Sequence, residues 1–316
     1  MSAVCKLLLL LTVFLIPLLG ATGNFGFEQS KILFFILSIS LIGFLWIRKG
    51  VRWTGISKAA GLFTLILLIT SLTGIDPKNS LIGQEPYFQG WVVYAYLFLF
   101  SLLVSSVAIK LEHVAMVLTG SATIVSLVAI QSWVSLNIFN IPVPTYAGRV
   151  VSTFGQPNFY AGFLLLTLPF SYLISQGQSL STQGVTLNNR KLNYFGLISG
   201  LISVTGIFVS YSRITILMAL MLLILGLIDQ LKIKFKVGLV VFGIVSLSVL
   251  LALRFSSGIV GDEVSKPILT KNPDLTKESV EKRAYIWPVA WQVVGQRPFL
   301  GYGLENIGVA FSDYFK

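Results

Sequence analysis

The chain has 316 residues, of which 55% are hydrophobic and only 11% charged, and its mean hydropathy is +0.84. A soluble globular domain carries roughly 25% charged residues, so this composition leaves too few polar side chains to cover a surface that faces water. Soluble, disordered and disulfide-stapled proteins are therefore excluded, and a protein that crosses a membrane several times remains. The single cysteine, Cys5, excludes an intrachain disulfide, and the single histidine, His113, excludes a His-rich metal site.

Apolar runs recur along the chain with short polar segments between them. They predict an all-α, polytopic transmembrane helical bundle of about nine spans, because about 20 helical residues cross the hydrocarbon core of a bilayer. The runs are 3–19, 32–47, 59–72, 91–109, 114–136, 159–174, 194–209, 214–228 and 237–253. The first run has the composition of a signal peptide. We interpret it as a retained helix, because a retained first span places the loops rich in Lys and Arg on the cytoplasmic side.

The net charge of +11 would suggest nucleic-acid binding in a soluble protein, but the positions of the charges give another explanation. With the N-terminus in the cytoplasm, the cytoplasmic segments hold 11 basic and two acidic residues. The short outer loops hold four basic and three acidic residues. Because Lys and Arg are retained on the cytoplasmic side, the sequence predicts a cytoplasmic N-terminus and no nucleic-acid partner.

The composition changes after the ninth run, which divides the chain into a transmembrane domain, 1–253, and an extracytoplasmic segment, 254–316. The second part holds eight basic and seven acidic residues. Apolar side chains recur there at helical spacing, at Val280, Ala284, Trp287, Trp291 and Val294. This spacing predicts an amphipathic helix over 279–296 with a kink at Pro288.

Three outer segments combine an arginine with a tight turn or the start of a helix. The first, 148–159, holds Arg149 and leads into the sixth run. We expect Asn158 to cap that helix and Gly155 to shape the turn. Free N–H groups and the helix dipole at such an end attract anions, so the segment is a candidate anion site. The alternative is an ordinary capped loop with a solvated arginine.

The second outer segment, 210–213, brings Arg213 to the start of the eighth run. An arginine at that depth could bind a lipid phosphate, and its planar guanidinium suits bidentate recognition. The alternative is an anchor residue whose charge reaches toward the membrane surface.

The third outer segment joins Arg283 to the turn 298–306, with Trp287 one helical turn after the arginine. Gly301 and Gly303 permit a tight backbone path, and the nearby aromatic side chains could stack against sugar faces. The alternative is an amphipathic helix and turn that lie on the membrane surface.

Together these blocks resemble the O-antigen ligase and polymerase superfamily. The usual sequence motifs of that family are G-T-F-G-N-P-N, S-R-G, R-x-x-x-W and P-x-x-G-x-G-x-x-x-F. Here the blocks read Arg149…Ser152-Thr153-Phe154-Gly155-Gln156-Pro157-Asn158-Phe159-Tyr160-Ala161-Gly162, then Ser212-Arg213, then Arg283-x-x-x-Trp287, then Pro298-x-x-Gly301-x-Gly303-x-x-Asn306. The resemblance covers about 146–310. Two residues depart from these motifs: Gln156 stands where the family often has Asn, and Ile214 where it often has Gly.

The resemblance implies an integral glycosyltransferase of the bacterial cytoplasmic (inner) membrane, active in cell-envelope polysaccharide biosynthesis. The implied donor is a glycan on undecaprenyl diphosphate, transferred outside the membrane without a cofactor, nucleotide sugar, ATP or metal. The acceptor would be a lipopolysaccharide core, a growing polysaccharide or a protein, with membrane lipids as further partners.

By motif, the resemblance implies that Arg149 and Arg213 hold the diphosphate and that Arg283 assists. Its supporting residues would be Asn158, Gly155, Trp287, Gly301 and Gly303. The family's proposed general base is a histidine in an outer His-Asn segment, which we expect beyond Lys316. The chain would then be inactive alone.

Two other functions fit a polytopic helical protein. A transporter or flippase for a lipid-linked substrate is one, although the predicted spans carry almost no ionisable residues and ion-coupled transporters usually place them there. A non-catalytic membrane scaffold is the other.

Overall fold

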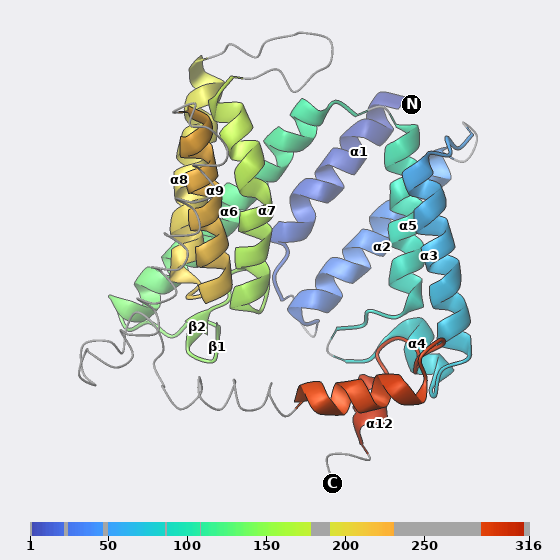
Figure 1. Ribbon diagram of the computed structural model, residues 1–316. Helices are drawn as coiled ribbons and strands as arrows, with labels where there is room; N and C mark the ends of the chain where they lie inside the picture. The colour runs from blue at the N-terminus through green and yellow to red at the C-terminus, as the bar shows by residue number, and fades with distance from the viewer. Residues whose placement is uncertain are drawn as a thin grey trace, which may run out of the picture. The chain divides into compact units, whose positions relative to one another are not determined.

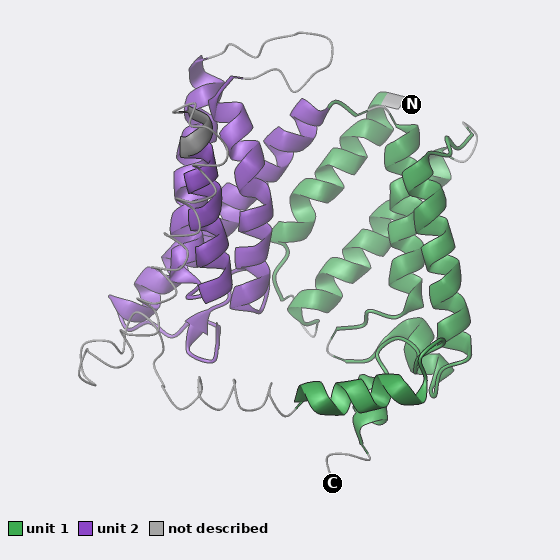
Figure 2. Cartoon of the chain, in the orientation of Figure 1, with its two compact units in different colours: residues 1–110, 277–316 green, residues 111–276 purple. Residues whose placement is uncertain are grey.

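The computed structural model describes residues 2–21, 25–46, 50–85, 87–107, 109–177, 190–230 and 286–312 (Figure 1). The predicted ninth span and Arg283 lie outside the described residues. The chain forms two compact units, Met1–Lys110 with Lys277–Lys316 and Leu111–Thr276 (Figure 2). The predicted division at residue 253 also falls outside the described residues and stays a prediction.

The described helices confirm an all-α polytopic membrane protein. Five are long and apolar enough to cross a membrane, namely α2 (Phe27–Trp46), α3 (Gly55–Leu72), α6 (Leu111–Asn137), α7 (Pro157–Ser175) and α8 (Arg190–Val209). Three apolar helices are shorter or have a shorter apolar part, namely α1 (Ser2–Leu15), continued by the 3-10 turn η1 (Ile16–Leu18), α5 (Trp91–Ser106) and α9 (Arg213–Gln230). These helices correspond to the first eight predicted runs.

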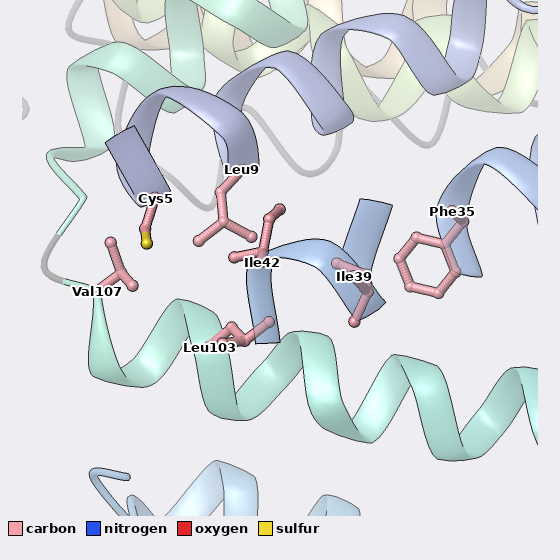
Figure 3. Packing of buried hydrophobic residues seen from close by; sticks show 7 residues of the cluster. All are labelled: Cys5, Leu9, Phe35, Ile39, Ile42, Leu103 and Val107. Atoms are coloured by element: carbon pink, nitrogen blue, oxygen red, sulfur yellow. The ribbon is translucent and has the colours of Figure 1, made fainter. Parts of the chain in front are cut away.

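In the first unit, α1, α2 and α5 enclose an apolar cluster. Figure 3 shows its side chains pointing toward one another from the three elements: Cys5, Leu9, Phe35, Ile39, Ile42, Leu103 and Val107. At its edge the rings of Phe35 and Phe100 meet edge to face, with their centroids 5.9 Å apart. The Cys5 thiol is buried within this packing and serves as a small apolar group.

Helix α3 packs along α5 in the same unit (Figure 1). A capping box starts α3, because the Thr54 hydroxyl accepts from the backbone N–H of Ser57 and the Ser57 hydroxyl accepts from that of Thr54. Further along, the indole N–H of Trp91 donates to the carbonyl of Thr64 at 2.9 Å. After α3 the chain turns into the short helix α4 (Pro77–Ile82), which also contacts α5.

The second unit is built on α6, α7 and α8, with α9 against α7 and α8. Small residues let the helices approach closely, as is typical of membrane helices. A Cβ added at Gly196 would lie 2.6 Å from the backbone nitrogen of Ser175, and one at Gly206 would lie 2.9 Å from Ser126. The hairpin of β1 (Thr145–Tyr146) and β2 (Arg149–Val150) connects α6 to α7.

The C-terminal part of the first unit contains the helix of residues 286–296, which we call the crossing helix, and α12 (Ile307–Phe311). The crossing helix confirms the described part of the helix predicted over 279–296. Its Val289 and Val293 pack against Ala310 of α12.

Candidate functional site

The β1–β2 hairpin holds Arg149 immediately before α7. Tyr146 pairs with Arg149 across the hairpin, and Ala147 and Gly148 form the turn between them. Both turn residues have positive φ, 50° and 73°, the combination that a type I′ turn requires. The arginine therefore projects from a short hairpin whose turn geometry matches the strands.

The segment between this hairpin and α7 is fixed by local contacts. The Ser152 hydroxyl donates to the carbonyl of Val125 in α6 at 2.8 Å. Phe154 stacks on Phe163 of α7 with their centroids 5.5 Å apart. Gly155 has a φ of +71°, which favours glycine and confirms its predicted place in the turn.

The prediction that Asn158 caps α7 is wrong. The helix begins at Pro157 and its N-cap is Gln156, whose side chain makes no capping hydrogen bond. Proline is preferred at the first helical position, because it has no N–H to leave unpaired and its φ is already helical. Asn158 is therefore the second helical residue, and its side-chain oxygen accepts a hydrogen bond from Nη1 of Arg149 at 3.4 Å.

Arg213 is the first residue of α9, as predicted, and only three residues separate that helix from the end of α8. Tyr211 adopts a positive φ of 52° in this turn, and its hydroxyl accepts from the indole N–H of Trp133 in α6 at 2.9 Å. The hydroxyls of Ser212 and Thr215 lie 2.8 Å apart across the first turn of α9. The turn is thus held from both sides, and Arg213 itself is exposed.

Arg149 and Arg213 influence each other electrostatically. Burial lowers the pKa of the Arg149 guanidinium, and the charge of Arg213 lowers it further, while Tyr160 and Tyr146 act in the opposite direction. No carboxylate among the described residues contributes to this shift. The guanidinium of Arg149 is therefore partly buried and close enough to Arg213 to be influenced by its charge.

Sequence reasoning missed Tyr160, which was part of a motif but was given no role. Tyr160 is wholly buried in the first turn of α7, where its neighbours include Arg149, Ser210 and Tyr211. Its hydroxyl makes no well-formed hydrogen bond with a described residue. The signal was available, because Pro157, Tyr160, Ala161, Leu164 and Leu168 recur at helical spacing and form the buried face of α7.

The turn 298–306, which carries the last of the four motif blocks, packs against the loop before α4 within the first unit. Gly301 and Gly303 have φ values of +62° and +87°, as the predicted tight backbone path requires. A Cβ at Gly74 would lie 2.5 Å from the carbonyl oxygen of Tyr302. Close backbone packing is therefore the observed role of this turn.

Two polar side chains fasten the turn to α4 and to the segment that follows it. The amide nitrogen of Asn306 donates to the hydroxyl of Ser80 at 2.9 Å and to the carbonyl of Tyr302 at 2.8 Å, and the residue is buried. The carboxylate of Glu305 accepts from the backbone N–H groups of Gln84 and Gln89. Glu305, the nearest carboxylate to the turn, thus has a structural contact that no local pattern indicated.

The predicted site residues fall into two groups. Arg149, Gly155, Asn158 and Arg213 lie together in the second unit, and Trp287, Gly301 and Gly303 lie in the first unit. Trp287 is 73% exposed. Only the first group is brought together around a pair of cations.

The described helices define a polytopic helical membrane protein whose second unit brings Arg149 and Arg213 near each other. Residues 198–316 match the family model described as O-antigen ligase. The resemblance inferred from the motifs is thus confirmed over these residues, which include Arg213 but not the block around Arg149. Comparison with the curated proteins and with the solved structures gave no match.

Proposed function

We propose that the protein transfers a glycan from undecaprenyl diphosphate to an acceptor outside the bacterial cytoplasmic membrane. The acceptor is a lipopolysaccharide core, a growing polysaccharide or a protein. In this proposal Arg149 and Arg213 hold the diphosphate and Arg283 assists from the outer segment. Gly155 and Asn158 shape the site, and Trp287, Gly301 and Gly303 support the outer segment.

One observation carries the proposal: the half-buried Arg149 lies close enough to Arg213 to be influenced by its charge, and no described carboxylate contributes to the pKa shift of Arg149. Each stands at the beginning of an apolar helix, Arg149 before α7 and Arg213 on α9. Unpaired N–H groups and the positive end of the dipole add to the attraction for an anion at both helix starts. A diphosphate would offset the mutual repulsion of the guanidiniums and form charge-assisted hydrogen bonds with them.

The chemistry of glycosyl transfer can use such a site when the bond to the leaving group breaks. The bond between the anomeric carbon and the diphosphate oxygen breaks, and the acceptor oxygen bonds to the same carbon and loses its proton. Negative charge grows on the departing lipid diphosphate, so preorganised cations lower the barrier. We assign the arginines to this leaving group and assign the acceptor's proton to no described residue.

The experiment measures glycan transfer in membranes that contain the protein with Arg213 replaced by Ala or by Lys. We expect Arg213→Ala to abolish transfer at unchanged protein level, and Arg213→Lys to retain only a small part of it, because an ammonium lacks the bidentate geometry. Arg190→Ala is the matched control, since Arg190 also begins an apolar helix, α8. Full activity of Arg213→Ala would refute the assignment.

The same strains distinguish a flippase from a transferase. If the protein transfers glycan, the lipid-linked intermediate accumulates on the outer leaflet when Arg213 is lost. Accumulation on the cytoplasmic leaflet would instead support a flippase.

A further inference from the structure

We infer that the crossing helix lies in the lipid interface of the membrane, with the aromatic face formed by Trp287, Trp291 and Val294 turned toward the headgroups. This surface is separate from the arginine pair, and the inference does not depend on the proposed transfer reaction. The interaction partner is a lipid surface.

The crossing helix divides into three sectors. Val289 and Val293 are buried against α12. Trp287, Trp291 and Val294 are 73%, 78% and 52% exposed, and helical geometry places them together on the side roughly opposite the two valines. The helix therefore leaves a second apolar face uncovered by the described residues.

The exposed side chains of Gln292 and Gln296 lie on one flank of the helix, between the two apolar faces. Gln292 lies about 160° around the helix axis from Val294, at 100° per residue. An exposed apolar stripe with two tryptophans, bordered by polar side chains, is typical of a helix that lies at a membrane surface.

The position of the helix relative to a membrane-crossing helix supports the same partner. The backbone N–H of Ile75, three residues beyond the end of α3, donates to the carbonyl of Tyr302 at 3.1 Å. Within this unit the crossing helix, drawn in red, runs transverse to α3 and α5 near their ends (Figure 1). If α3 and α5 cross the membrane, the helix of residues 286–296, which runs transverse to them at the level where α3 ends, lies along the membrane plane.

Tryptophan is the residue type expected there. Its indole is apolar over most of its area and carries one N–H, so it concentrates at the boundary between hydrocarbon and water. Phe299, which is 95% exposed just after the helix, adds another large apolar side chain. A water-facing surface would leave all three rings in solvent without a partner.

The single cysteine makes a direct test possible. Cys5→Ala gives a cysteine-free background, into which Val294→Cys or Gln292→Cys introduces one spin label on each sector of the crossing helix. The full chain is reconstituted in nanodiscs, and collision rates with oxygen and with a water-soluble nickel chelate are measured. We expect the label at 294 to collide preferentially with oxygen and the label at 292 preferentially with the chelate.

Two results would overturn the inference. The label at 294 could be as accessible to the chelate as the label at 292, which would place that face in water. It could also be shielded from both reagents, which would indicate a protein partner or a second copy of the chain.

A measurement on the native side chains guards against misfolding of a labelled variant. Lipids brominated near the headgroup should quench the wild-type protein more than the Trp287→Phe/Trp291→Phe variant. Equal quenching of the two proteins would also count against the inference.

Discussion

Gly303 lies so close to Ser80 that a Cβ on the glycine would come within 2.4 Å of the serine hydroxyl oxygen. The two residues are far apart in sequence, yet Asn306 also reaches this hydroxyl. A glycine is therefore required at position 303, because the N-terminal and C-terminal segments of the first unit pack against each other there.

Gly303→Ala should destabilise the first unit. The substitution combines a steric clash with a φ of +87°, and we expect a loss of about 2–4 kcal/mol. Thermal unfolding in detergent measures the effect. Gly308→Ala is the control, because a Cβ at Gly308 meets nothing within 4 Å and should leave the unfolding temperature unchanged. Equal stability of the two variants would contradict the packing argument.

Glu305→Gln should loosen the loop that carries Gln84 and Gln89. The carboxylate accepts from both backbone N–H groups, and an amide can accept through only one oxygen. We expect hydrogen exchange at these two amides to accelerate about tenfold or more, since a hydrogen bond to a charged group contributes about 1.5–3 kcal/mol. Unchanged exchange at both amides would show that the contact contributes nothing to local stability.

Asn158→Ala should weaken donor binding without changing the fold. The side-chain oxygen of Asn158 restrains Arg149 through one long hydrogen bond, so we expect KM for the lipid-linked donor to rise about twofold to fivefold at constant kcat. Asn158→Asp should raise KM further, because a carboxylate would compete with the diphosphate for Arg149. If the Asp variant bound donor as well as the wild type, Arg149 would not be a diphosphate ligand.

Tyr160→Phe should separate stability from donor binding. The buried hydroxyl makes no well-formed hydrogen bond with a described residue, so its removal should change the free energy of unfolding by less than about 1 kcal/mol. If the hydroxyl faces the diphosphate, donor affinity should fall about tenfold. Binding isotherms and thermal unfolding on the same preparation test both expectations. Loss of stability with normal affinity would identify Tyr160 as a packing residue.

Gly196→Ala should disrupt the contact between α7 and α8. The added Cβ would lie 2.6 Å from a backbone nitrogen of α7, which cannot move aside as a side chain can, and we expect a loss of about 1–3 kcal/mol. Gly200→Ala, one turn further along α8, meets only an ordinary contact with Ser171 at 3.6 Å and should be tolerated. Protein level in the membrane and unfolding temperature distinguish the two variants.

Hydropathy predicted the described helices well but not their ends. The run 59–72 misses the beginning of α3 at Gly55, because the capping box that starts the helix is polar and lies outside the apolar pattern. At α7 the capping preference of Asn158 was given more weight than the preference of Pro157 for the first helical position. Terminal residues are decided by such local competition, whereas the existence of a span depends on many residues at once.

The candidate site was predictable where it is local. Arg213 stands at a helix start that the apolar runs already delimit, and Arg149 stands beside a recognisable turn. The buried position of Tyr160 could have been inferred from helical spacing, but the sequence analysis gave this residue no role. The partners of Glu305 could not be predicted, because they are backbone N–H groups 221 and 216 residues away and leave no trace in side-chain pattern.

The contact of Glu305 and Asn306 with the loop around α4 has a consequence for biosynthesis. At about 5–20 residues per second, the ribosome needs roughly 10–45 s to proceed from this loop to the turn that fastens it. During that interval the amides of Gln84 and Gln89 lack the carboxylate that later accepts from them. Closure of the first unit is therefore a late event in synthesis, because the contacts that fasten the segment around α4 form only after Glu305 and Asn306 have been made.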